Sequence, residues 1–266
     1  MKNQNNTSIS ASITSQKPAK KAITITIGAT LIVIAILMIV FIAYVNSYSR
    51  ANTEGLQQFE TTYLSQSITV AQDKAGNIAV KQKDTAPTTA LIFYPGGKVE
   101  NTAYIPLMQK CAESGILCII ARMPCNLAFL NTGAANSIKK AHPEITNWYI
   151  GGHSLGGVAA SSYVKKHADD FDGLILLGSY ASKDISNTNI NVLTIRGTND
   201  EVVTLSDHNE NLSNLPSGYR EAFIEGGCHA YFGMYGEQKG DGTPTISPQD
   251  QIIQTAYLIT GFINSN

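Results

Sequence analysis

Charged residues are scarce in this chain, at 15% of 266 residues, and its first 49 residues contain no acidic residue. The formal net charge of −1 gives no basic surface for nucleic acid, so we expect no nucleic-acid partner. The four cysteines are too few for a disulfide scaffold, and no His/Asp/Cys cluster has metal-ligand spacing. We therefore expect no metal and no cofactor. An apolar share of 43% excludes a disordered chain.

What the chain does have is one long uncharged stretch between Lys21 and Arg50, in which residues 22–45 are almost entirely apolar. A helix of about 20 residues crosses a hydrocarbon core of roughly 30 Å. A buried core helix is rarely so long or apolar on every face. The stretch also exceeds the apolar core of a cleaved signal peptide, and no convincing Ala-x-Ala site follows it. We expect residues 22–45 to form one transmembrane helix that acts as a signal anchor in the lipid bilayer.

The charges that flank this helix predict its orientation. Three lysines precede it within residues 17–21, whereas Arg50 stands alone on the far side. The positive-inside rule then places the N-terminus in the cytoplasm. The expected organisation is a cytoplasmic polar tail (1–21), the membrane helix (22–45), a polar tether (46–65) and an extracellular domain (66–266) at the cell membrane.

The region 66–266 alternates between strand and helix patterns. An antiparallel hairpin is expected from Ser67–Gln72 and Asn77–Lys83, with Gly76 in the turn. Short, continuous apolar runs typical of buried parallel strands are Ala90–Tyr94, Ile116–Ile120, Trp148–Ile150, Leu174–Leu177 and Val192–Ile195, with a last strand near Glu221–Ile224. Helical stretches lie at about 102–114, 134–142, 155–168, 205–214 and 248–263. This order predicts one α/β domain, a mostly parallel sheet with helices on both faces.

The segment Gly152–Gly156 reads Gly-His-Ser-Leu-Gly, between an expected strand and an expected helix. A G-x-S-x-G sequence in that context is typical of a nucleophile elbow, in which a tight turn lifts the serine Oγ above the sheet edge. The residues two before and two after the serine crowd together, so glycine is needed at both. Ser154 is therefore the expected nucleophile. An ordinary glycine-rich turn is the alternative.

A serine needs a base and an orienting acid, which in this arrangement follow it in the order acid, then histidine. Asp200 ends a buried strand at the expected carboxyl edge of the sheet. Glu201 competes with it but adjoins two valines, and Asp172 begins its strand and so lies at the opposite edge. Asp200 is the expected acid, with a helix cap or Asx turn as its alternative role.

His229 is the expected base, because it alone follows the last strand at the same edge as Ser154, in a glycine-rich loop. A solvated loop histidine is the alternative. Three other histidines lie in or beside helices, and we expect His208 on a polar helix face. His153 is expected to point away from Ser154 as a packed supporting residue.

An acyl-transfer intermediate requires two backbone donors for its oxyanion. We expect one from Leu155, at the start of the helix after Ser154. The other is expected from the loop Tyr94–Val99, where glycine allows close approach to a substrate. Gly97 is the expected donor, and Lys98 remains an alternative.

These features together resemble the α/β-hydrolase superfamily, and more narrowly a small bacterial group of membrane-anchored serine α/β hydrolases. The segments that carry the resemblance are Phe93–Glu100, Met123–Ala128, Gly152–Gly157, Gly197–Asp200 and Gly227–Gly233. The resemblance covers about residues 66–266 and implies the α/β-hydrolase fold and a Ser154/Asp200/His229 catalytic triad. The chain departs from the familiar His-Gly oxyanion motif in having Pro95-Gly96.

The expected activity is hydrolysis of carboxylic esters through an acyl-enzyme on Ser154. Only Tyr180–Asn191 separate two strands where such proteins often insert a cap, so we expect no cap domain and a shallow site for a small-molecule, lipid or cell-envelope ester. A peptidase, thioesterase or transacylase would use the same residues. An inactive hydrolase-like binding module is the alternative from another class.

Overall fold

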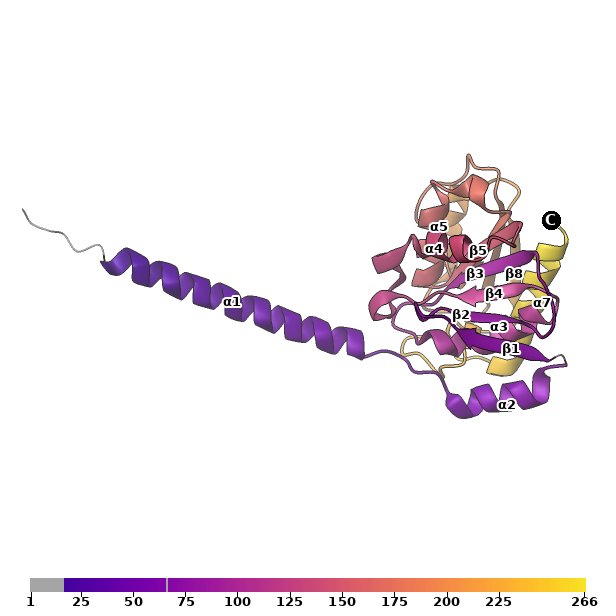
Figure 1. The fold of residues 1–266 in the computed structure, drawn as a ribbon, viewed down its shortest axis with the longest axis horizontal. Coiled ribbons are helices and arrows are strands. Elements are labelled where there is room, and N and C mark those ends of the chain that lie inside the picture. Colours follow the sequence, from indigo (N-terminus) through magenta and orange to yellow (C-terminus); the bar gives the residue numbers. More distant parts are fainter. Residues whose placement is uncertain (1–16, 66) are drawn as a thin grey trace, which may run out of the picture. The chain divides into compact units, whose positions relative to one another are not determined.

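The computed structural model describes residues 17–65 and 67–266, which divide into a single helix, α1 (Lys17–Asn46), and a compact domain from Ser47 to Asn266 (Figure 1). By length and composition, Ile23–Asn46 of α1 is apolar enough to cross a membrane, with a mean hydropathy of 3.0. Its side chains are exposed over this span rather than packed into a core. The chain therefore carries one apolar helix near its N-terminus that is long enough to be an anchor or a signal sequence.

The domain is built on one eight-stranded sheet in the order β1-β2-β4-β3-β5-β6-β7-β8. The strands are β1 (Ile68–Gln72), β2 (Ile78–Gln82), β3 (Thr89–Tyr94), β4 (Leu117–Ile120), β5 (Asn147–His153), β6 (Gly173–Leu177), β7 (Asn191–Gly197) and β8 (Arg220–Ile224). The first two form an antiparallel hairpin, and β2 pairs antiparallel with β4; all later pairs are parallel. Gly76 occupies the hairpin turn with φ +88°, as expected.

Helices cover both faces of this sheet (Figure 1). They are α2 (Thr53–Tyr63), α3 (Ile105–Ala112), α4 (Ala134–Ala141), α5 (Leu155–Val164), α6 (Leu205–Asn211) and α7 (Pro248–Asn264). Short 3₁₀ turns lie at Asn101–Tyr104, Pro124–Asn126, Ala128–Asn131, Ala168–Asp170, Leu212–Asn214 and Ala230–Phe232. Side chains of α3 and α7 form one apolar core against the sheet, and those of α4 and α5 form the other. The prediction of a mostly parallel α/β sheet is confirmed.

Helix α2 lies where a polar tether, 46–65, was expected. Phe59 is fully buried in the core on the α3 side, and Leu56 and Tyr63 pack partly against it. Asn52 caps the helix by accepting a hydrogen bond from the N–H of Gly55 at 3.0 Å. This 3–4-residue spacing of apolar side chains is a helical stripe within an otherwise polar segment. The compact domain accordingly begins at Ser47 and not at residue 66.

Candidate active site

The turn between β5 and α5 has a strained backbone at Ser154, with φ 52° and ψ −127°. A Cβ on Gly152 would lie 2.5 Å from the carbonyl carbon of Gly156, and one on Gly156 would lie 2.1 Å from the carbonyl oxygen of Tyr94. Backbone therefore occupies the space that any side chain at these two positions would need. The Ser154 carbonyl oxygen accepts a hydrogen bond from Ser179 Oγ at 2.7 Å, which helps to hold the turn.

Asp200 and His229 form a buried hydrogen-bonded pair at the carboxyl edge of the sheet. Asp200 follows β7, and its Oδ2 lies 2.8 Å from His229 Nδ1. The other oxygen, Oδ1, accepts the N–H groups of Val202 at 3.0 Å and Val203 at 2.9 Å. These bonds fix the carboxylate and assign the proton to His229 Nδ1. His229 Nε2 is buried without a partner among the described residues, so it can accept a proton.

The backbone of β6 connects this pair to the serine. The N–H of Ser154 donates to the carbonyl oxygen of Leu177 at 3.0 Å, and Gly178 follows with φ +45°. A Cβ on Gly178 would lie 2.9 Å from Asp200 Oδ2 and 3.0 Å from His229 Nδ1. The structure thus brings the three residues expected for a triad to one short stretch of the sheet edge.

The loop after β3 presents one free amide beside the serine. The N–H of Lys98 donates to the carbonyl oxygen of Asn126 at 2.7 Å, and the N–H of Gly96 donates to the hydroxyl of Tyr104 at 3.0 Å. No such bond is recorded for the Gly97 N–H within the described residues. A Cβ on Gly97 would lie 2.5 Å from Leu155 Cδ1, so these two residues adjoin. The geometry therefore favours Gly97 over Lys98 as the loop residue whose N–H could act together with the N–H of Leu155.

Tyr104 and His153 support the loop that contains Gly97 through hydrogen bonds. The Tyr104 hydroxyl, which accepts the Gly96 N–H, lies 2.8 Å from His153 Nδ1. The bond from Gly96 leaves the hydroxyl proton unused, and we assign that proton to a hydrogen bond from Tyr104 to Nδ1. The His153 ring lies 4.5 Å from the His229 ring, centroid to centroid. Burial, and then the charge of His229, lower the pKa of His153 well below its usual value, which keeps its ring neutral.

The loop that carries His229 is clamped from two sides. Asp241 Oδ1 accepts the N–H of His229 at 3.1 Å, and its Oδ2 accepts the N–H of Ala230 at 2.8 Å. The buried Gln251 amide accepts from the N–H of Cys228 at 3.0 Å and donates to its carbonyl oxygen at 2.7 Å. Sequence reasoning missed Asp241 and Gln251, because they lie 11–23 residues along the chain from the backbone groups that they bind. The only local pattern near either residue is the dipeptide Asp241-Gly242.

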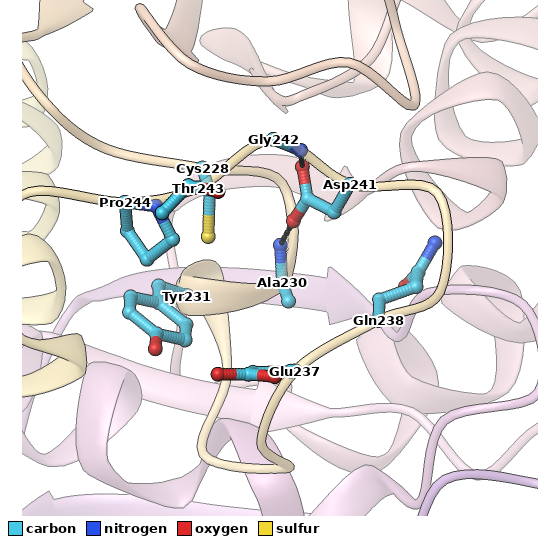
Figure 2. Close-up of a pocket in the computed structure, with 9 residues that line it drawn as sticks. All are labelled: Cys228, Ala230, Tyr231, Glu237, Gln238, Asp241, Gly242, Thr243 and Pro244. Carbon is cyan, nitrogen blue, oxygen red and sulfur yellow. Dashed lines mark hydrogen bonds between the residues drawn. The ribbon is translucent and has the colours of Figure 1, made fainter.

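A pocket of about 130 Å³ lies beside this loop. Figure 2 shows its lining residues, with the Asp241 carboxylate hydrogen-bonded to the backbone N–H groups of Ala230 and Gly242. The residues that line it are Cys228, Ala230, Tyr231, Glu237, Gln238, Asp241, Gly242, Thr243 and Pro244. Ser154 is not among them, so this pocket does not hold the reacting centre. Burial, followed by the charge of Asp241, raises the pKa of the Cys228 thiol to about 12. This cysteine therefore remains a thiol and not a nucleophilic thiolate.

The other candidate groups lie away from the serine. His142 and His167 pair with neighbouring carboxylates near the surface. His208 is only 2% exposed, so the prediction that it lies on a polar helix face is wrong. It lies on the face of α6 that packs against β8, with Nε2 3.3 Å from a carboxylate oxygen of Glu221. Asp172 bonds the N–H of Trp148 near the amino end of β5, at the edge opposite Ser154.

Comparisons with known proteins agree with this architecture. The sequence model of the alpha/beta hydrolase family matches residues 90–253. Among solved structures, the fold is similar to that of Est1E from Butyrivibrio proteoclasticus, with a TM-score of 0.55 at 15% sequence identity, over 73% of this chain and 98% of that one. No match was found among curated proteins. The family match covers more than half of the chain, and the chain therefore belongs to the α/β hydrolase family.

Proposed function

We propose that the protein is a serine esterase in which Ser154 is the nucleophile, His229 the general base and Asp200 the orienting acid. The observation that carries the proposal is the buried Asp200–His229 hydrogen bond of 2.8 Å beside the strained turn of Ser154. A serine on such a turn, with a histidine whose Nε2 is free to accept its proton, is the arrangement that acyl transfer requires.

In this mechanism His229 Nε2 takes the proton of Ser154 as Oγ attacks the ester carbonyl carbon. Asp200 stabilises the resulting imidazolium, and the amides of Gly97 and Leu155 bind the oxyanion. His229 then gives the proton to the leaving alcohol. Water, activated by the same histidine, releases the acid from the acyl-enzyme and restores Ser154.

The surroundings of Ser154 favour an ester substrate that the protein does not enclose when it binds. Residues 178–190, between β6 and β7, contain no helix or strand, so no cap domain is inserted there. Ser154 itself is partly exposed. This favours small or surface-presented esters over substrates that require a deep pocket.

Replacing Ser154 with alanine tests the proposal. Ester hydrolysis should fall by roughly 10⁴-fold or more, because the remaining site can only bind and polarise the carbonyl. Labelling by a fluorophosphonate probe should disappear. The exposed Ser182 provides the matched control. The variant Ser182→Ala should keep both ester hydrolysis and labelling. Undiminished labelling of Ser154→Ala would exclude this serine as the nucleophile.

We further propose that α1 is a membrane anchor with the N-terminus in the cytoplasm and the domain outside the cell. The support is the placement of basic residues at the two ends of the apolar span: Lys17, Lys20 and Lys21 lie just before it, whereas Arg50 alone lies just after it. Protease added to intact cells should remove a C-terminal epitope tag and the domain with it. Complete protection in intact cells, with cleavage only after lysis, would reverse the proposed orientation.

A further inference from the structure

The chain enters the domain beside the loop that carries the proposed oxyanion donor. The N–H of Ser49 donates to the carbonyl oxygen of Lys98 at 2.8 Å, and the N–H of Glu100 donates to the carbonyl oxygen of Ser49 at 2.9 Å. Ala51 adds a hydrogen bond from its N–H to Glu100 Oε2 at 3.0 Å. The entering segment is thus fixed against the loop within two residues of Gly97.

Covalent geometry limits how far this loop can lie from the end of α1. Helix α1 ends at Asn46, three residues before Ser49. An extended chain spans about 3.3–3.6 Å per residue, so the two residues are at most about 11 Å apart whatever the angle between helix and domain. Since the apolar span Ile23–Asn46 also ends there, only residues 47 and 48 separate that span from the segment bonded to the loop of Gly97.

Large apolar side chains are exposed at this same edge. Phe129 is 58% exposed and Leu130 is 47% exposed, in the 3₁₀ turn that follows β4. Leu155, which adjoins both Ser154 and Gly97, is 47% exposed. The 3₁₀ turn packs against α5. Asn126, just before the turn, accepts a hydrogen bond from the N–H of Lys98 and so connects this segment to the loop that contains Gly97, which we call the oxyanion loop. We call Phe129, Leu130 and Leu155 the apolar rim.

Exposed cations accompany the apolar rim. Arg50 follows the end of α1 and lies over the Tyr48 ring, 5.2 Å from its centroid, and Arg122 follows β4 at the carboxyl edge. Arginine and tyrosine are the residues that favour the headgroup region of a bilayer, where cations meet lipid phosphates. Apolar and cationic side chains therefore occur together on the sheet edge at which the chain enters the domain.

We propose that the apolar rim inserts into the membrane surface and that Ser154 acts on esters of amphiphiles whose acyl chains remain in that leaflet. This inference rests on the proposed esterase activity. Attack of Ser154 Oγ breaks the ester C–O bond, the alcohol leaves with the proton held by His229, and water then releases the fatty acid and returns a proton to Ser154. The bilayer delivers its own lipid, which accounts for a site without a cap domain.

Fluorescence quenching tests the contact with lipid independently of catalysis. Trp148 is the sole tryptophan and is buried near the amino end of β5, away from the rim. The full chain carrying Phe129→Trp is reconstituted in vesicles of brominated phosphatidylcholine. Quenching of about twofold over unbrominated vesicles is expected, as for a side chain at the acyl boundary. The control Tyr257→Trp, on α7 at a position 78% exposed, should show no added quenching. Equal quenching of the two variants would overturn the proposal.

Activity tests the substrate class. Phe129→Ser/Leu130→Ser should lower hydrolysis of a long-chain ester in the vesicle membrane by about tenfold and leave hydrolysis of a soluble acetate ester within about twofold, because only the first substrate depends on lipid contact. Tyr257→Ser should change neither rate. An equal loss on both esters, or none on the vesicle ester, would refute the role of the rim. If the unaltered protein cleaves neither ester while Phe129→Trp is quenched, the esterase proposal fails and the lipid contact stands.

Discussion

At the scale of single residues, two neighbouring histidine side chains with tilted rings have different roles. His229 accepts and returns a proton in the proposed mechanism, whereas His153, 4.5 Å away, is held neutral. The distinction matters because a second positive charge beside His229 would oppose formation of its imidazolium. The Tyr104 hydroxyl serves both ends of this arrangement, since it bonds His153 Nδ1 and the Gly96 amide.

We therefore expect Tyr104→Phe to impair catalysis without removing any group that touches the substrate. Loss of the hydroxyl leaves the buried Gly96 N–H unpaired and frees the loop that positions Gly97. A displaced oxyanion donor should lower kcat by about 10- to 100-fold and change KM by less than about threefold. Steady-state kinetics with a soluble ester measures both constants.

Tyr149→Phe is the matched control, because it too removes a buried tyrosine hydroxyl, which donates to the carbonyl oxygen of Ile263 at 3.3 Å. That bond lies on β5 near its amino end, away from the loop. A similar loss of kcat in both variants would mean that Tyr104 acts through overall stability alone.

The residues of the candidate site could be predicted from the sequence only where the chain itself carries the signal. Ser154 lies in a local motif, Asp200 follows the buried strand β7, and His229 follows β8, the last strand, at the same edge of the sheet. Tyr104, Asp241 and Gln251 act through one or two side-chain hydrogen bonds each, to backbone that lies 8 to 23 residues away in the chain. No local pattern specifies such a bond, since it depends on how loops pack.

At the scale of elements, the turn between β5 and α5 requires close backbone contacts. Gly156→Ala should destabilise the protein by about 3 kcal/mol or more, since the added methyl group would meet the carbonyl oxygens of Tyr94 and Pro95 at 2.1 and 2.4 Å. Both acceptors are backbone atoms that only a shift of the end of β3 can move. Urea unfolding of the purified protein measures the loss.

Gly261→Ala is the opposite test within the same protein. Gly261 lies in α7, and a Cβ there meets nothing within 4 Å, so alanine should stabilise the protein by about 0.5–1 kcal/mol through its higher helix propensity. Equal effects at the two glycines would contradict the steric account of the turn.

The strands were predictable and helix α2 was not, for a physical reason. Strands buried on both faces read as continuous apolar runs, such as Ala90–Tyr94. Helix α2 buries one narrow stripe around Phe59 and is otherwise polar, which is the composition of a solvated linker. Only packing against the domain distinguishes the two.

At the scale of the whole molecule, the near-zero net charge combines a basic leader with an acidic domain, and the compact domain begins close to the boundary between them, at Ser47. A chain that starts at Ser47 should fold and hydrolyse a soluble ester. One that starts at Ser67 lacks α2 and the Ser49 bonds to Lys98 and Glu100. Removing the fully buried Phe59 alone should lower the free energy of unfolding by about 3–5 kcal/mol, and releasing the entering segment also frees the oxyanion loop.

Thermal unfolding and ester turnover of the two chains measure these effects. The variant Phe59→Ala in the longer chain separates the loss of stability from the change in loop position. Equal turnover by both chains would show that the entering segment serves only to connect the domain to α1.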